Sequence, residues 1–303
     1  MLPVVHSLAY EVELPGHIWP TAKYRLIADR LASAQIEWRE PGQASWDDLA
    51  LVHTSEYLTK IRENRLTPSD IATLELPWRP ALADAFRLMA GGTCDAARAA
   101  LDTGLAAHLG GGLHHAFANH GEGFCPLNDV AVAIRVLQRD HRVARAAVID
   151  CDVHQGNGTA MIFEQDPSVF TFSIHQQHNY PMFKPRSDID IGLDDGAGDK
   201  TYLNALSRAL PRVLESRPQL VVYLAGADPF EGDQLGGLAV TKAGLEERDR
   251  IVIGSCRDAG IPLAMALSGG YAADLRDTVD VHVRTVEIMI QVPRFYGSTV
   301  LRF

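Results

Sequence analysis

The feature that most constrains the fold is an alternation of short apolar runs with longer helical segments, which begins near residue 82. Strands that are buried on both faces of a parallel sheet read as continuous apolar runs, and helices connect them. The order therefore predicts an α/β fold in which a central, mostly parallel sheet carries helices on both faces. The apolar runs are 105–109, 146–149, 169–174, 220–225 and 263–267, and the expected helices are 82–102, 128–138, 159–164, 202–214 and 243–256.

No linker, repeat or charge block divides the chain, so residues 1–303 are interpreted as a single domain. The first 80 residues have a less regular pattern than the rest of the chain. We expect them to hold one strand, two helices and a long loop.

Composition and charge exclude several classes of protein. Hydrophobic residues make up 47% and charged residues 22% of the chain, which excludes a disordered protein. The net charge of -10 opposes binding to nucleic acid. No apolar run is long enough for a membrane helix, and the first residues lack the basic start of a secretion signal, so a cytoplasmic protein is expected. The four cysteines form no CxxC pair and are expected to be reduced thiols.

Four polar clusters follow predicted strands, where a buried core would be apolar. Because the carboxyl ends of parallel strands meet at one edge of a sheet, and sites gather there, we expect the clusters to lie together. They are GGGLHH (110–115), DCDVHQGNG (150–158), AGADPFEGDQLGG (225–237) and SGGY (268–271).

The second and third clusters contain candidate metal ligands. Asp152 and His154 are two residues apart, so in an extended segment their side chains would point the same way. Asp228 ends an apolar run, where an unpaired carboxylate would be costly to desolvate unless it met a cation. The alternative for Asp228 is a helix N-cap. Three ligands with one open position are typical of catalytic zinc, whereas structural zinc sites are closed.

Other polar residues of the clusters are candidates for proton transfer. His114 and His115 follow three glycines, and on a bent loop both rings can face one cavity. Asp150 is available to fix the tautomer of one ring, and Asn157 could do so for the other without a charge. Tyr271 follows two glycines and could donate a hydrogen bond to an oxyanion. Taken singly, the histidine pair would be better explained by one surface and one core histidine, and Tyr271 by a tyrosine packed at a strand end; the four clusters together favour the functional interpretation.

The segments GGGLHHA, FCPLNDVAVA, DCDVHQGNGT, AGADPFEGDQLGGL and SGGY together resemble the histone deacetylase superfamily, from about Val52 to Tyr271. The pairing of HQGNG with EGDQLGGL is most similar to class IV deacetylases and their bacterial relatives. The resemblance implies an arginase-deacetylase fold. It also implies hydrolysis of an acyl group from an amine, commonly the side chain of lysine in a protein or peptide.

The resemblance also implies roles for single residues. Asp152, His154 and Asp228 match the zinc ligands of the family, and zinc-activated water would attack the acyl carbonyl. His115 matches the general base and acid, and Tyr271 matches the tyrosine that stabilises the transition state.

Three more polar positions follow from the same comparison. His114 matches the second, more electrostatic histidine, and Asp150 would orient it. Asn157 stands behind His115, where some classes have an aspartate. The family's inner potassium site would map onto Asp150, Asp152, His154, Ser173 and Ile174, mainly through backbone carbonyls.

The resemblance further predicts the walls of an acyl-lysine tunnel. Phe124 matches an aromatic wall, and Gly270 is assigned to the substrate-binding set with it. Leu113 stands where many relatives place Trp or Phe near the tunnel floor. Because leucine has a smaller side chain, we hypothesise that the tunnel accepts acyl chains longer than acetyl. The facing wall stays open among Tyr180, Pro181 and Phe183.

Three alternatives remain beside lysine deacylation. A small-molecule amidohydrolase acting on acetylated polyamines would use the same residues, although the sequence shows no conspicuous insertion that would narrow the site. A catalytically silent acyl-lysine-binding module would be expected to lack the tyrosine or the base, and both are present. A binuclear manganese ureohydrolase would need a carboxylate where Gly156 stands, so one metal ion is expected. The sequence leaves the oligomeric state open.

Overall fold

All strands belong to one eight-stranded sheet in the computed structural model, which describes residues 1–293 and 295. The order across the sheet is β2-β1-β3-β8-β7-β4-β5-β6, and every pair of neighbours is parallel. The strands are β1 (Leu2–Val5), β2 (Ile36–Arg39), β3 (Leu105–His108), β4 (Ala146–Asp150), β5 (Val169–Gln176), β6 (Ile189–Leu193), β7 (Val221–Leu224) and β8 (Leu263–Ala266).

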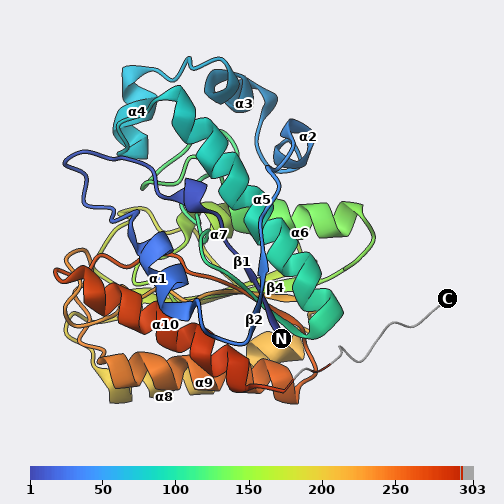
Figure 1. Cartoon of the computed structure of the whole chain (residues 1–303), viewed down its shortest axis with the longest axis vertical. Helices are drawn as coiled ribbons and strands as arrows, with labels where there is room; N and C mark the ends of the chain where they lie inside the picture. The colour runs from blue at the N-terminus through green and yellow to red at the C-terminus, as the bar shows by residue number, and fades with distance from the viewer. Residues whose placement is uncertain (294, 296–303) are drawn as a thin grey trace.

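Helices cover both faces of this sheet (Figure 1). On one face, α5 packs on β1, β3 and β8 and on α6; on the other, α9 lies between α8 and α10, and α10 packs on α1. The helices are α1 (Lys23–Leu31), α2 (Trp46–Leu49), α3 (Ser55–Arg62), α4 (Pro68–Leu74), α5 (Pro80–Thr103), α6 (Asp129–Arg139), α7 (Asn157–Phe163), α8 (Asp199–Glu215), α9 (Lys242–Asp258) and α10 (Leu275–Gln291), with a short 3-10 helix at Leu8–Tyr10.

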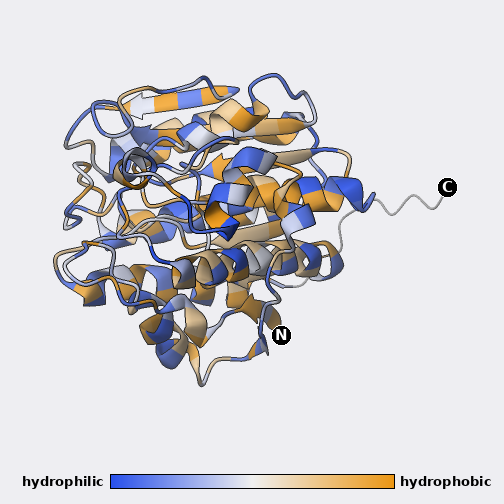
Figure 2. Cartoon of the chain, turned by 90° about the horizontal axis from the view of Figure 1, so that it is seen from above, coloured by the Kyte–Doolittle hydropathy of each residue, from blue (hydrophilic) through white to orange (hydrophobic). Residues whose placement is uncertain are grey.

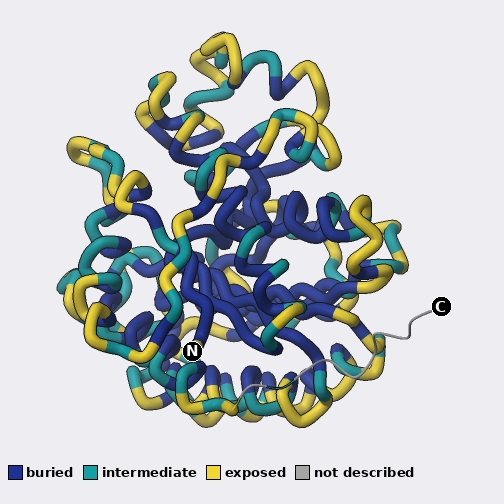
Figure 3. Tube along the Cα trace, turned by 45° about the vertical axis from the view of Figure 1, so that its right-hand side comes forward, coloured by how far each residue is buried: buried dark blue, intermediate teal, exposed yellow. Residues whose placement is uncertain are grey.

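The apolar runs fold as the sequence pattern predicts. Every residue of β3, β4, β7 and β8 is buried, because helices close both faces of the inner strands. Figure 3 shows these strands as the buried centre of the molecule, and Figure 2 shows hydrophilic and hydrophobic residues alternating along the surrounding helices. The α/β fold with helices on both faces is confirmed, and the sheet is parallel throughout.

The sequence pattern misses several elements. The first 80 residues contain two strands and four α-helices rather than one strand and two helices. Helices α2, α3 and α4 are only 4, 8 and 7 residues long, so caps at Ser45, Thr54 and Thr67 define them better than periodicity does. Strand β6 and helix α10 were also not expected. No helix in the described part of the chain is long and apolar enough to cross a membrane.

Candidate active site

The four polar clusters meet beyond the carboxyl ends of β3, β4, β7 and β8, as the sequence predicts. They surround a cavity of about 180 Å³. Its lining includes both histidines of the first cluster, two of the candidate metal ligands and Tyr271. The lining residues are Trp19, Tyr24, Glu75, Gly111, Gly112, Leu113, His114, His115, Gly123, Phe124, Cys125, Asp152, His154, Asn179, Tyr180, Leu235, Ser268, Gly269 and Tyr271.

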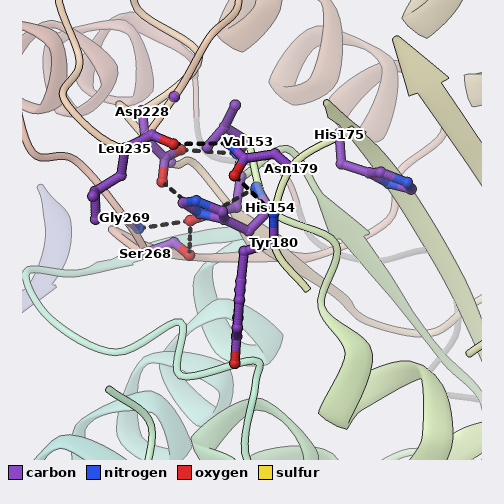
Figure 4. Close-up of polar contacts among 12 residues, drawn as sticks. Val153, His154, His175, Asn179, Tyr180, Asp228, Leu235, Ser268 and Gly269 are labelled. Atoms are coloured by element: carbon purple, nitrogen blue, oxygen red, sulfur yellow. Dashed lines mark hydrogen bonds and ion pairs between the residues drawn. The ribbon is translucent and has the colours of Figure 1, made fainter. Parts of the chain in front are cut away.

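The three candidate metal ligands converge at the base of this cavity. Nδ1 of His154 lies 3.1 Å from Oδ1 of Asp152 and 3.6 Å from Oδ2 of Asp228. One ligand atom from each residue lies within 4.8 Å of the others. The local conformation differs from the extended segment expected from the spacing, since β4 ends at Asp150 and residues 152–154 form a bend. Figure 4 shows the His154 ring directed toward Asp228 and the Ser268–Gly269 backbone.

The donor set fits a divalent cation. Oδ1 of Asp228 accepts a hydrogen bond from the backbone N–H of Val153 at 2.9 Å, but its buried Oδ2 makes no hydrogen bond with the described residues and lies 3.6 Å from Nδ1 of His154. A buried carboxylate oxygen without a partner is costly unless a cation meets it. Burial and the charge of Asp152 raise the pKa of Asp228. Burial alone would lower the pKa of His154, yet Asp152 and Asp228 raise it to about 10. The negative charge of the two carboxylates, which favours a proton on His154, also favours a metal ion at this position.

Glycines keep space free around these carboxylates. A Cβ atom on Gly269 would lie 1.9 Å from Oδ2 of Asp228. A Cβ atom on Gly156 would lie 2.4 Å from Oδ2 of Asp150, so a bridging carboxylate at this position would displace the Asp150 side chain. Within the described residues, Asp152, His154 and Asp228 form the one group of His, Cys, Asp or Glu side chains arranged to share an ion. The geometry therefore fits a single metal ion.

The histidine pair is held as the sequence suggests. Gly111 and Gly112 adopt φ of 67° and 79°, which turns the loop and brings both rings into the cavity. Nδ1 of His114 lies 2.7 Å from Oδ2 of Asp150, and Nδ1 of His115 lies 2.7 Å from Oδ1 of Asn157. The two Nε2 atoms are 3.1 Å apart.

These surroundings shift the pKa values of the two rings in opposite directions. Burial would lower the pKa of His114, but the charges of Asp150 and Asp152 outweigh burial and raise it to about 9. Burial and the neighbouring charges of His114 and His154 lower the pKa of His115 well below its usual value. The first shift favours the protonated form of His114 and the second favours the neutral form of His115, whose Nε2 can accept a hydrogen bond when Nδ1 donates to Asn157.

The Tyr271 hydroxyl belongs to the same cavity and makes no hydrogen bond with the described residues. Burial and the charges of Asp152 and Asp228 raise the pKa of Tyr271 well above its usual value, so the phenol remains a donor. Its backbone N–H donates to Oδ2 of Asp233 at 2.6 Å. The buried Nζ of Lys23 lies 5.6 Å from the centre of the Tyr271 ring.

Three of the residues predicted to bind the substrate line the cavity. Phe124 and Tyr180 both line the cavity: the Phe124 ring lies 6.0 Å from Tyr271, and the Tyr180 ring lies 5.0 Å from His115. Tyr180 also donates to Oε1 of Glu122 at 2.8 Å. Leu113 lines the cavity as expected.

Two residues of the predicted substrate-binding set lie elsewhere. Phe183 is 65% exposed and does not line the cavity, so of the candidates for the facing wall the structure favours Tyr180. Gly270 is buried beside α10, where an added Cβ atom would lie 2.9 Å from Thr278, and it does not line the cavity.

The residues of the predicted potassium site lie close together. Asp150 is the register partner of Ser173 across β4 and β5, and Ile174 follows in the same strand. Ser173 and Ile174 are buried. The position of an ion among the carbonyls of this set stays a prediction.

Sequence reasoning missed several supporting contacts. Ser268 Oγ and the Gly269 N–H each donate to Oδ2 of Asp152 at 2.8 Å. Lys23 donates from Nζ to the carbonyl of Ser268 at 2.9 Å. The SGGY motif marked the loop, but no local pattern connects Lys23 with a loop 245 residues further along the chain.

The parallel sheet and the Asp–His–Asp group at its carboxyl edge agree with the arginase-deacetylase fold that the sequence resemblance implies, and comparisons with known proteins support this fold. The crystal structure of the HDA15 HD domain is similar to this chain, with a TM-score of 0.79 and 25% sequence identity over 96% of this chain and 91% of that chain. The family model "Histone deacetylase domain" matches residues 17–286, a longer stretch than the motifs span.

Curated relatives narrow the assignment. An uncharacterised protein of Picosynechococcus is 41% identical over 92% of this chain and 95% of its own length. "Histone deacetylase 2" of Arabidopsis thaliana is 32% identical over 88% of this chain and 74% of its own length. "Histone deacetylase-like amidohydrolase" of Pseudomonas aeruginosa is 30% identical over 79% of this chain and 67% of its own length. The chain belongs to the histone deacetylase family.

Proposed function

We propose that the chain is a zinc-dependent hydrolase that removes an acyl group from the side-chain amine of lysine in a protein or peptide. The observation that carries this proposal is that the buried Oδ2 of Asp228 makes no hydrogen bond with the described residues, although it lies beside Asp152 and His154. Two carboxylates and an imidazole suit zinc, although ferrous iron accepts similar ligands. The names of the deacetylase relatives support an acylated amine as substrate.

Bound zinc would polarise the acyl carbonyl and lower the pKa of a water molecule. The side chains of the described residues would transfer the protons and stabilise the oxyanion. Neutral His115 accepts a proton from the attacking water at Nε2, while Asn157 holds its other nitrogen. The Tyr271 phenol donates a hydrogen bond to the developing oxyanion, and the His114 cation adds positive charge nearby. His115 then returns its proton to the leaving amine.

Acylated polyamines are a second candidate substrate, and one observation favours them. Glu75 lines the cavity, and no lysine or arginine does so among the described residues. Burial is the largest cause of the raised pKa of Glu75, and the charge of Glu122 adds to it, so a second carboxylate lies close to Glu75. A cationic group next to the acylated amine would be attracted there.

Turnover of both substrate types tests the proposal. We expect hydrolysis of a fluorogenic acyl-lysine peptide, its loss after treatment with a chelator, and its return with added zinc. No turnover of any acyl-lysine peptide or acetylpolyamine by the zinc-loaded protein would instead support a silent binding module. A higher kcat/KM for acetylpolyamines than for peptides would identify the small-molecule substrate.

The length of the acyl chain is a separate question. Leu113 leaves a smaller side chain at the cavity than Trp or Phe would, so we propose that chains longer than acetyl are accepted. Comparing acetyl with medium-chain and long-chain acyl-lysine peptides tests this, and a strong preference for acetyl would refute it. A potassium ion at the predicted inner site and a cytoplasmic location also remain proposals.

A further inference from the structure

A buried arginine lies beneath the loops that carry the candidate metal ligands. Arg248 belongs to α9, on the sheet face that α8 and α10 also cover (Figure 1). Its exposed fraction is 0%, which is rare for an arginine and costly unless its charge and donors are satisfied. The proposed chemistry does not use it.

The guanidinium contacts the backbone of both loops that carry the candidate metal ligands. Nη1 of Arg248 donates to the carbonyl of Gly226 at 2.5 Å, two residues before Asp228. The same Nη1 lies 3.5 Å from the carbonyl of Cys151, the residue before Asp152, and makes a weaker contact there. One rigid group therefore contacts the backbone of the loop after β7 and of the loop after β4.

A buried network fixes the guanidinium in turn. Nε of Arg248 donates to Oδ1 of Asp249 at 2.9 Å, and the Tyr223 hydroxyl of β7 donates to the same oxygen at 2.5 Å. The Thr285 hydroxyl of α10 donates to Oδ2 of Asp249 at 2.6 Å. Asp249, Tyr223 and Thr285 are all buried. The arginine is thus anchored to two helices and one strand.

Stability alone does not explain this ion pair. Replacing a buried ion pair with well-packed apolar residues is often neutral or stabilising, so a buried pair is weak evidence for a stabilising role. The planar guanidinium with fixed donor directions is suited to hold backbone groups at a set distance. The two loops it contacts already meet where the Val153 N–H donates to Asp228 at 2.9 Å.

We propose that Arg248 is a positioning residue that sets the spacing between Asp152 and Asp228 and so the affinity of the site for its metal ion. Asp249 and Thr285 act through Arg248. This inference rests on the proposed metal site. Groups that orient metal ligands without binding the metal typically change affinity about 10- to 100-fold when removed.

Zinc affinity of the folded protein tests the proposal. The dissociation constant for zinc is measured by competition with a chromophoric chelator, well below the unfolding temperature, for the wild-type chain, Arg248→Met and Val252→Ala. Val252 is a fully buried residue of the same helix, so its truncation controls for general destabilisation. We expect Arg248→Met to bind zinc at least about 10-fold more weakly and Val252→Ala to bind it as the wild type does.

The outcomes separate the two proposals. Equal zinc affinity of Arg248→Met and the wild type would overturn the positioning role and leave the proposed function intact. No zinc binding by the wild type would overturn both. Equal weakening by Val252→Ala would show that the loss reflects destabilisation, which also overturns the positioning role.

Two more conservative variants test the same proposal if Arg248→Met does not fold. Arg248→Lys retains the charge but not the planar set of donors, and Thr285→Val removes one donor to Asp249 while leaving Arg248 in place. Both are expected to weaken zinc binding, by less than about 10-fold for Thr285→Val. Unchanged affinity in both folded variants would overturn the proposal.

Discussion

Replacing Tyr271 with phenylalanine removes one hydroxyl and little else. The ring packs beside Phe124, at 6.0 Å between centroids, and lies 5.6 Å from Nζ of Lys23. Phenylalanine can keep these contacts. The lost hydroxyl makes no hydrogen bond with the described residues, so its removal leaves no buried partner unsatisfied. We therefore expect the unfolding temperature and the zinc content of Tyr271→Phe to match the wild type.

The catalytic effect should be large. The hydroxyl is a neutral donor inside a mostly enclosed site, and removing one oxyanion donor of this kind typically lowers kcat by about 10² to 10³, or ~3 to 4 kcal/mol. Because the contact forms mainly in the transition state, KM should change little. The assay is steady-state hydrolysis of an acyl-lysine peptide by protein loaded with one equivalent of zinc.

A second tyrosine supplies the control. The Tyr180 hydroxyl donates to Glu122 at 2.8 Å and has no assigned role at the reacting carbonyl. Tyr180→Phe should therefore lower kcat much less than Tyr271→Phe. A Tyr271→Phe enzyme with near-normal kcat would refute the reasoning, as would equal losses in the two variants.

Three further predictions concern the histidines and the glycines. His115→Ala should be nearly inactive and His114→Ala less affected, since the lowered pKa of His115 favours a neutral ring that can accept a proton, whereas the pKa of His114 is raised; the opposite ranking of kcat would reverse the assigned roles. Gly269→Ala should lose zinc in a metal assay because its Cβ atom would lie 1.9 Å from Asp228, whereas Gly254→Ala, with open space around it, should keep zinc; equal zinc content would contradict this. Burial lowers the pKa of His53 to about 4 from its ordinary value of 6.5, so between these pH values the unfolded chain binds a proton that the folded chain does not. About 3 kcal/mol of the free energy of unfolding, present above pH 6.5, is therefore lost as the pH falls toward 4. Urea unfolding between pH 7 and 5 should show a smaller loss of stability for His53→Gln than for the wild type, and equal losses would exclude this role.

The sequence predicts the inner strands and the polar clusters because both have local signatures. The apolar run before Asp150 marks β4, and the two-residue spacing of Asp152 and His154 marks candidate ligands. Asp228 follows from the cost of leaving a carboxylate unpaired directly after the apolar run that contains β7. These arguments need no knowledge of the rest of the chain.

Contacts between distant segments could not be predicted in this way. Lys23 and Arg248 carry no local pattern that connects them with the ligand loops, since their positions depend on how α1 and α9 pack under the sheet. The edge strand β6 was missed because exposed residues interrupt its apolar pattern. The capping boxes at Ser45 and Thr67 were visible as Ser/Thr followed three residues later by Asp, so those short helices had a signal that periodicity alone does not use.

The central claim is that Asp152, His154 and Asp228 share one metal ion, and metal content measures it most directly. The purified wild-type chain and Asp228→Asn are incubated with zinc, dialysed and analysed for metal by mass spectrometry. We expect about one zinc ion per wild-type chain and much less in Asp228→Asn, which keeps the shape of the side chain but not its charge. Stoichiometric zinc in Asp228→Asn, or none in the wild type, would contradict the account.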